Sequence, residues 1–310
     1  MAFAQNIPFF CIMLSMFSGT VSSVLPGKWA RRLNAAMLMA VVALSGWLLQ
    51  DLILSKIGSY TYMMGHFPAP WGNELRIGVL EACMALFFSI IMLLSLLGGR
   101  KKLHQEVEAT KHNIYYILCN LLLSSLLALI YTNDVFTAYV FIEINAITAC
   151  AIVMARRPGH SLVASVRYLV ISCVGSGLFL MGITLLYTCT GQLLMHGMDA
   201  AVQALAASGE YRVPLLIAVA LVTMGLVIKS ALFPFHTWVP DAYGFSTPTS
   251  AAVLSSLVSK GYIFLLIKIM YRVIGLDVVV STGITDVLFA ECTYSAIGNA
   301  YIQKLEGLIK

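Results

Sequence analysis

Three charged residues lie inside long apolar stretches and are the positions of this sequence best suited to do chemistry. Glu143 comes nine residues after Asp134, and Lys260 comes eleven residues after Thr249, the starts of two predicted helices. If those helices span a bilayer, each side chain lies about 14–17 Å deep in a hydrocarbon core about 30 Å thick. The third residue is Lys229. A charge at that depth costs about 2.5–3.5 kcal/mol, so such residues are functional by default. The alternative is a buried structural ion pair without a transport role.

A buried carboxylate beside a buried ammonium is suited to switching a proton. In a low dielectric the pair favours the charged form of both groups, and separating or burying them does the reverse. Lysine is tuned easily in this way. When the pair opens, the amine releases its proton to the next site. We therefore predict a proton relay from Lys229 to Lys260 that is gated by Glu143.

Pro234 predicts a break in the helix that carries Lys229. Proline removes one backbone donor and clashes with the carbonyl four residues earlier, here that of Ser230. Freed carbonyls at membrane depth are tolerated only beside protein or water, and broken helices near a charge recur in transporters. In the alternative, the helix ends at Phe233 and Lys229 snorkels to the interface. The pattern alone leaves these two open.

Three further ionisable residues are weaker candidates. His236 follows the break, and its ordinary pKa near neutrality suits a proton relay; the alternative is a structural histidine that is satisfied by its neighbours. Asp241 follows in the same segment and is a possible secondary residue. Glu81 lies near the exterior end of the third predicted helix, where it is either a secondary site residue or merely interfacial.

The composition indicates an all-α membrane protein. Of the 310 residues, 60% are hydrophobic and 11% are charged, whereas soluble domains carry about 25% charged residues. The net charge of +5 sits in short clusters and indicates no nucleic-acid partner. The seven cysteines form no C-x-x-C pair, and no metal cluster, cofactor motif or nucleophile elbow is recognisable. We expect no metal, no cofactor and no enzymatic activity of the chain itself.

Eight apolar stretches are long enough to span a bilayer, and the seventh contains the predicted break. They run approximately over Asn6–Leu25, Ala35–Leu54, Ile77–Leu97, Asn113–Tyr131, Asp134–Ala155, Val163–Tyr187, Pro214–Phe233 and Thr249–Tyr271. The connector between the second and third stretches predicts a structured exterior loop. Gly175 and Gly177 predict close helix packing.

The charges of the connectors predict an orientation. Ten basic residues occupy alternate connectors and three occupy the others. The first set is Lys28, Arg31, Arg32, Arg100, Lys101, Lys102, Lys111, Arg156, Arg157 and Arg167, and the second is Lys56, Arg76 and Arg212. The positive-inside rule then predicts a multi-pass protein of the cell (plasma) membrane with its N-terminus outside.

The segment KSALFPFHTWVPDAYGFSTPTSAAVLSSLVSKGYIFLLIK, residues 229–268, resembles a family signature. It is similar to the antiporter-like subunits of respiratory complex I, of Mrp-type sodium/proton antiporters and of energy-converting membrane-bound hydrogenases. NDVFTAYVFIEINAITACAIVMARR resembles the fifth helix of that family, and GHFPAPWGNELRIGVLEA resembles its second-to-third helix connector. The resemblance covers roughly residues 65–274.

The resemblance implies roles for four residues. Glu143 matches the fifth-helix glutamate, Lys229 the lysine of the broken seventh helix, and Lys260 the connecting residue of the eighth. His236 matches the histidine after the break. The resemblance therefore favours the broken helix over a snorkelling Lys229.

The resemblance also implies an organisation. Family members have about fourteen helices built from two inverted five-helix repeats. We expect a three-helix segment with the exterior loop over residues 1–111, a first five-helix repeat over 112–274 and a divergent polar tail over 275–310, as in a C-terminally truncated product. The implied function is proton or sodium/proton translocation through a Glu–Lys–Lys relay, with other membrane subunits as partners in an antiporter or an oxidoreductase complex. The alternative is a half-antiporter that serves only as a structural membrane module.

Overall fold

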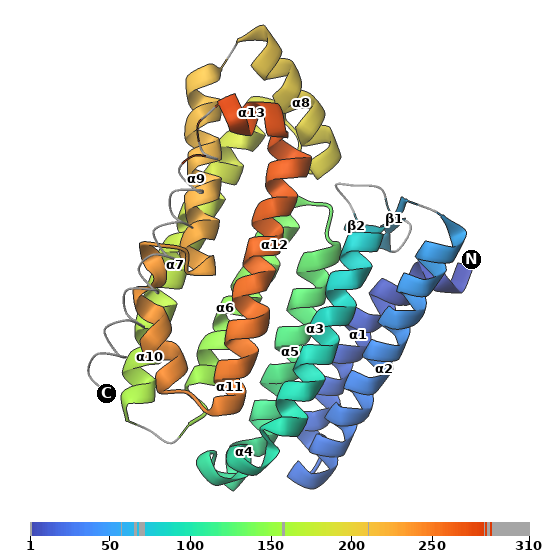
Figure 1. Ribbon diagram of the computed structural model, residues 1–310, viewed down its shortest axis with the longest axis vertical. Coiled ribbons are helices and arrows are strands. Elements are labelled where there is room, and N and C mark those ends of the chain that lie inside the picture. The colour runs from blue at the N-terminus through green and yellow to red at the C-terminus, as the bar shows by residue number, and fades with distance from the viewer. Residues whose placement is uncertain are drawn as a thin grey trace, which may run out of the picture.

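The protein is a bundle of membrane-spanning helices with a small hairpin at one end (Figure 1). The structure, a computed structural model, describes residues 2–56, 58–64, 67, 72–156, 159–209, 211–281, 283 and 286. Parts of the predicted exterior loop, Arg157 and the tail from residue 287 lie outside the described residues.

Eight helical stretches of the described chain are long and apolar enough to cross a membrane, which confirms the predicted number. They are Gln5–Val24, Gly27–Ser55, Val79–Gly98, His112–Tyr131, Val135–Val153, His160–Thr190, Arg212–Gly244 and Pro248–Ile274.

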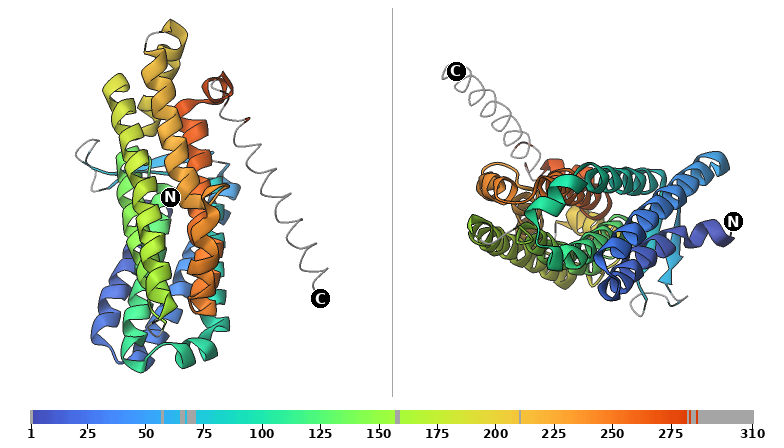
Figure 2. Two further views of the ribbon diagram at one scale, coloured as in Figure 1. Left: turned by 90° about the vertical axis from the view of Figure 1, so that its left-hand side faces the viewer. Right: turned by 90° about the horizontal axis from the view of Figure 1, so that it is seen from below.

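The first six stretches are single helices, and each is bounded within a few residues of its prediction except the second, which begins at Gly27 and not at Ala35. They are α1 (Ala2–Val24), α2 (Gly27–Ser55), α3 (Val79–Gly98), α5 (His112–Tyr131), α6 (Val135–Val153) and α7 (His160–Thr190). The short α4 (Arg100–Glu106) joins α3 to α5, with a 3₁₀ turn at Ala109–Lys111. Seen end-on, α1 and α2, in blue, lie on the opposite side of the bundle from α7, in yellow-green (Figure 2).

The seventh stretch is broken, as the sequence predicted. Helix α9 (Arg212–Ser230) ends four residues before Pro234, and Ala231 adopts a left-handed conformation with φ 60°. A 3₁₀ turn (Phe235–Trp238) and α10 (Val239–Gly244) follow. The break therefore occupies residues 231–234, Pro234 and the three residues before it, which agrees with the loss of regular geometry expected before a proline.

The eighth stretch is continuous but irregular. It comprises α11 (Pro248–Val253), a π-helical turn (Leu254–Val258), α12 (Ser259–Ile269) and a second π-helical turn (Met270–Ile274). The short α13 (Leu276–Ser281) follows. The π-helical turns were not predicted, because they leave no mark in hydrophobic periodicity, and such bulges are frequent at functional sites.

The connectors at the end away from α4 are structured. Strands β1 (Ser59–Met63) and β2 (Glu74–Gly78) pair antiparallel within the predicted exterior loop. Helix α8 (Met195–Ser208) lies at the same end of the bundle (Figure 1). Its 14 residues are too few to span a bilayer, which is why a search for spanning stretches missed it.

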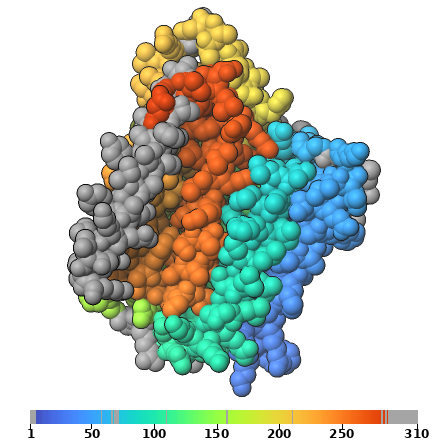
Figure 3. Space-filling model, in the orientation of Figure 1, coloured from blue at the N-terminus to red at the C-terminus, as the bar shows by residue number. Residues whose placement is uncertain are grey.

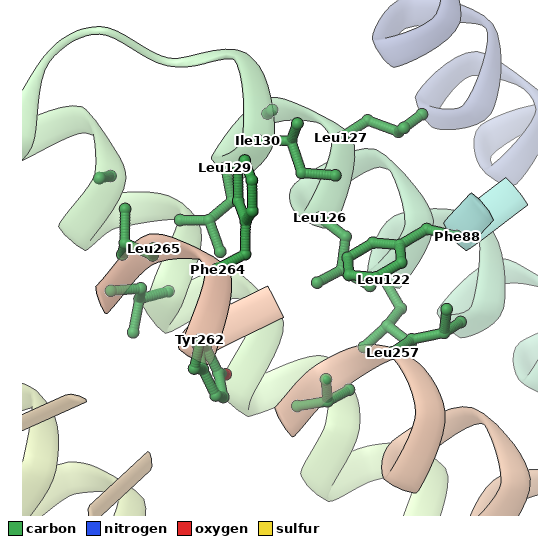
Figure 4. Close-up of a cluster of buried hydrophobic side chains, with 14 of the residues drawn as sticks. Phe88, Leu122, Leu126, Leu127, Leu129, Ile130, Leu257, Tyr262, Phe264 and Leu265 are labelled. Atoms are coloured by element: carbon green, nitrogen blue, oxygen red, sulfur yellow. The ribbon is translucent and has the colours of Figure 1, made fainter. Parts of the chain in front are cut away.

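Helix α5 forms the centre of the apolar core. Its side chains are buried on nearly every face between α1, α3, α6 and α12. Leu122 and Leu126 lie near Phe88 of α3 and Leu257 of the π-helical turn (Figure 4). This packing fixes the positions of α6 and α12, the helices that carry Glu143 and Lys260.

Candidate functional site

Glu143 and Lys229 form an ion pair between α6 and α9. The Lys229 Nζ lies 3.5 Å from the Glu143 Oε1. The lysine side chain has no exposed surface, whereas 28% of the glutamate side chain is exposed. Asp134 caps the start of α6, where its carboxylate accepts the Thr137 N–H at 2.6 Å, and so sets the depth of Glu143. One partner is thus sealed inside the protein and the other reaches its surface.

Two more helices complete the surroundings of the Lys229 amine. The amine donates a hydrogen bond to the Ser172 hydroxyl of α7 at 3.0 Å. It also lies 5.8 Å from the centre of the Tyr262 ring of α12, within the range of a cation–π interaction. The buried ammonium is therefore held by one carboxylate, one hydroxyl and one aromatic face.

A line of polar groups continues from Tyr262 into the bundle. The Tyr262 hydroxyl donates to the Asn145 Oδ1 at 3.0 Å, and the Asn145 amide donates to the Ser125 hydroxyl at 3.2 Å. All three residues are buried. This line was not predicted, and its only sequence signal is the presence of polar residues inside apolar helices.

The backbones of α7 and α9 approach closely beside the ion pair. A Cβ at Gly175 would lie 3.0 Å from the Gly225 carbonyl oxygen and 3.1 Å from the Lys229 Cγ. A Cβ at Gly177 would meet no atom within 4 Å. The predicted close packing therefore holds for Gly175 and does not hold for Gly177. The partner glycine, Gly225, was not predicted.

Lys260 points away from the ion pair. It comes two residues before Tyr262, so the two side chains leave α12 about 200° apart, and Tyr262 faces Lys229. The Lys260 side chain is exposed and makes no hydrogen bond or ion pair with any described residue. Helix α12, in orange, lies on the face turned towards the viewer in Figure 3.

The two candidates after the break also lie apart from the pair. His236 is exposed and its ring stacks on that of Phe233 at 5.8 Å. Asp241 forms an ion pair with the Arg167 guanidinium of α7. Of the four residues predicted for the relay, the fold brings only Glu143 and Lys229 into contact.

Glu81 belongs to a second charged cluster. It is buried, with 1% of its side chain exposed, and its Oε1 lies 2.6 Å from the Arg272 Nη1. Lys268 is also buried, and its amine donates to the Ile130 carbonyl at 2.8 Å and to the Thr132 carbonyl. Glu81, in the first turn of α3, is therefore buried against other helices. Lys268 was missed as a buried charge, although its position inside an apolar stretch was a signal.

Within the described residues, no group of three or more His, Cys, Asp or Glu side chains could hold a metal ion.

Comparison with known sequences places the second half of the chain in a defined family. The profile described as NADH:quinone oxidoreductase/Mrp antiporter, transmembrane, matches residues 132–298. The NADH-quinone oxidoreductase subunit N of Desulforudis audaxviator is 29% identical over 271 residues, which is 86% of this chain and 53% of that protein. A probable K⁺/H⁺ antiporter subunit of Rhizobium meliloti is 27% identical over 73% of this chain and 40% of that protein.

Solved structures have the same fold. A chain of the membrane-bound sulfane sulfur reductase, an archaeal respiratory membrane complex, superimposes with a TM-score of 0.82 at 25% identity, covering 95% of this chain and 58% of that chain. A chain of the Mrp complex from Dietzia superimposes with a TM-score of 0.75 at 22% identity, covering 88% and 49%. This chain spans about half the length of the curated relatives it matches. With the family profile matching more than half of its residues, the chain belongs to the transmembrane family of NADH:quinone oxidoreductases and Mrp antiporters.

Proposed function

We propose that this chain is an ion-translocating membrane subunit of a multisubunit complex, and that the Glu143–Lys229 pair is its proton switch. The observation that carries the proposal is a fully buried lysine held 3.5 Å from a carboxylate that reaches the surface of the bundle. Such a pair stabilises the ammonium while closed and destabilises it when the carboxylate moves away.

The proton enters and leaves the switch by different routes. Glu143, with 28% of its side chain exposed, takes up the proton. Lys229 carries it at the end of α9, beside the break over residues 231–234. Broken helices provide the unpaired carbonyls and the mobility that transporters use at such sites.

Lys260 receives the proton in the next step. Its amine lies on the far side of α12 from Lys229, so the transfer runs through water around Tyr262 and needs no direct contact. A charged amine at mid-membrane depth requires a polar environment in the assembled complex. His236 and Asp241, between the break and the basic end of the bundle, exchange protons with that side as secondary groups.

The complex itself lies in the cell membrane. The basic connectors meet at one end of the bundle, where Arg31 contacts His104 at 3.2 Å and Arg156 pairs with Glu106 at 3.5 Å. By the positive-inside rule this end faces the cytoplasm and the N-terminus lies outside. Redox chemistry, where the parent complex performs it, belongs to partner subunits. Protons are the cargo that the ion pair explains, and sodium exchanged for protons is the other cargo of the proposal.

The test compares proton pumping with turnover in membrane vesicles that contain the assembled complex. We expect Glu143→Gln and Lys229→Ala each to abolish the share of pumping carried by this subunit while the complex still assembles. The control is Glu108→Gln, which makes the same carboxylate-to-amide change at an exposed pair with Lys111. Undiminished pumping in either site variant rejects the proposal. Loss of assembly, with unchanged pumping per assembled complex, favours the alternative of a structural membrane module.

A further inference from the structure

A cavity with a strongly basic rim opens at the end of the bundle where α2 begins and α3 ends. Its volume is about 340 Å³, within the range of about 300–1,000 Å³ that is typical of ligand pockets. Arg31 and Arg32 of α2 and Arg100 of α4 line it together. These elements meet at the lower end of the blue and teal surfaces in Figure 3.

The three guanidinium groups form no ion pair with any carboxylate of the described residues. Arg31 contacts the His104 ring nitrogen at 3.2 Å, and Arg32 lies 5.2 Å over the Trp29 ring. Neither contact supplies a negative charge. The rim therefore carries positive charge that these contacts leave unbalanced.

The acidic side chains at this end are engaged with other cations. Glu106 pairs with Arg156 at 3.5 Å, and Glu108 pairs with Lys111 at 3.2 Å. Their charges are already matched, so they do not neutralise the arginines of the cavity.

The titration of His104 reports the same positive field. Burial lowers the pKa of His104, and the charges of His112, Arg31 and Arg100 lower it further. An imidazole resists protonation where neighbouring cations already crowd it. Arg31 and Arg100 of the rim therefore both contribute, after burial, to the lowered pKa of His104.

The inner walls of the cavity are apolar. Below the arginines the lining consists mainly of leucines of α2 and α3, including Leu38 and Leu96, with the buried Asn34 and Tyr116 beside them. The basic mouth suits an anionic headgroup, and the apolar walls suit acyl chains. Together they fit a lipid that lies in the membrane beside α2 and α3.

We propose that this cavity binds the phosphate headgroup of an anionic phospholipid from the leaflet at the basic end of the bundle. Guanidinium groups bind phosphate oxygens in pairs of parallel hydrogen bonds. Basic pockets between membrane helices on the cytoplasmic side are suited to such headgroups. The acyl chains run along the leucines of α2 and α3, and the bound lipid supplies the anion that the protein lacks there.

The test measures retained lipid by native mass spectrometry of the purified complex, reconstituted with phosphatidylglycerol, cardiolipin or phosphatidylcholine. The site variant is Arg31→Gln with Arg100→Gln. The control is Lys101→Gln with Lys102→Gln, which removes the same charge from exposed positions of α4 outside the lining. Each basic residue near an anionic surface raises the affinity for anionic lipid by about a few-fold. Without two arginines, the site variant should bind anionic lipid about 10–30-fold more weakly, and its binding of phosphatidylcholine should be unchanged.

Equal unfolding midpoints of the two double variants in zwitterionic detergent establish that both fold. Equal loss of anionic lipid from both then overturns the proposal, because it indicates general attraction to a basic surface. Displacement of the lipid by millimolar inorganic phosphate also overturns it, since the acyl chains would contribute nothing. A third result would also overturn the proposal: anionic lipid that binds the isolated chain but is absent from the complex. That result would assign the cavity to an acidic segment of a partner subunit.

Discussion

Substituting Gly225 by alanine perturbs the ion pair through the backbone. The added Cβ would lie 2.6 Å from the Gly175 carbonyl oxygen, 2.7 Å from the Phe179 nitrogen and 2.8 Å from the Phe179 Cβ. Two of these atoms belong to the backbone of α7 and cannot move aside by changing rotamer. Helix α9 must therefore shift away from α7, and it carries Lys229 away from the Ser172 hydroxyl, now at 3.0 Å.

The expected difference from a matched control is the cost of overpacking. Overpacking a close helix contact costs about 1–3 kcal/mol. The matched control is Gly177→Ala, where the new Cβ meets no atom within 4 Å and the better helix propensity of alanine gains about 0.5–1 kcal/mol. Because Gly225→Ala also gains this propensity, that gain cancels in the comparison, and the free energies of unfolding of the two variants should differ by about 1–3 kcal/mol.

Equilibrium unfolding in mixed detergent micelles measures this difference, and the pumping assay reports the displacement of the amine. We expect Gly225→Ala to lose both stability and pumping and Gly177→Ala to keep both. If the two variants have equal free energies of unfolding and pump equally, the close approach of α7 and α9 does not position Lys229, and the reasoning is refuted.

Two further predictions concern groups outside the proposed switch. Glu81→Gln leaves the Arg272 charge without its carboxylate partner and should lower the free energy of unfolding by about 3–5 kcal/mol. Adding Arg272→Gln should restore part of this loss. A double variant that is less stable than Glu81→Gln alone would contradict the pairing. The pKa of His104 is lowered in the folded chain, first by burial, so its contribution to stability is present above the ordinary value of 6.5 and is lost as the pH falls below it. Unfolding midpoints at pH 7 and pH 5 should therefore differ less in His104→Gln than in the wild type, and an equal difference would exclude this residue.

The sequence was sufficient to predict the spanning helices, and together with the family resemblance it favoured the break. A stretch of about 20 apolar residues can satisfy its backbone in lipid only as a helix, so the eight spans followed from composition and length. The proline showed that the regular helix cannot run through this point, and the resemblance chose the broken helix over a helix that ends at Phe233. The structure has both features, with α9 ending at Ser230.

From the sequence, candidate site residues could be placed only along the helix axis. Counting residues gives depth, and depth singled out Glu143, while Lys229 was chosen for its place before Pro234; the fold brings these two together at 3.5 Å. The same count put Lys260 at that level, yet its side chain leaves α12 on the face opposite Tyr262. Whether Lys260 passes a proton stays a prediction.

Direction around each helix axis and the choice of neighbouring helix were decided by tertiary structure. Arg272, in the second π-helical turn, pairs with Glu81 of α3, and Ser172 of α7 meets Lys229 of α9, 57 residues further along the chain. Hydropathy is nearly uniform around these helices, since lipid and protein interior are equally apolar, so the pattern along the chain carries little record of which face packs inward. The sequence by itself therefore determined which residues lie within the membrane, and only the packing of α6, α7, α9 and α12 decided which of them form a site.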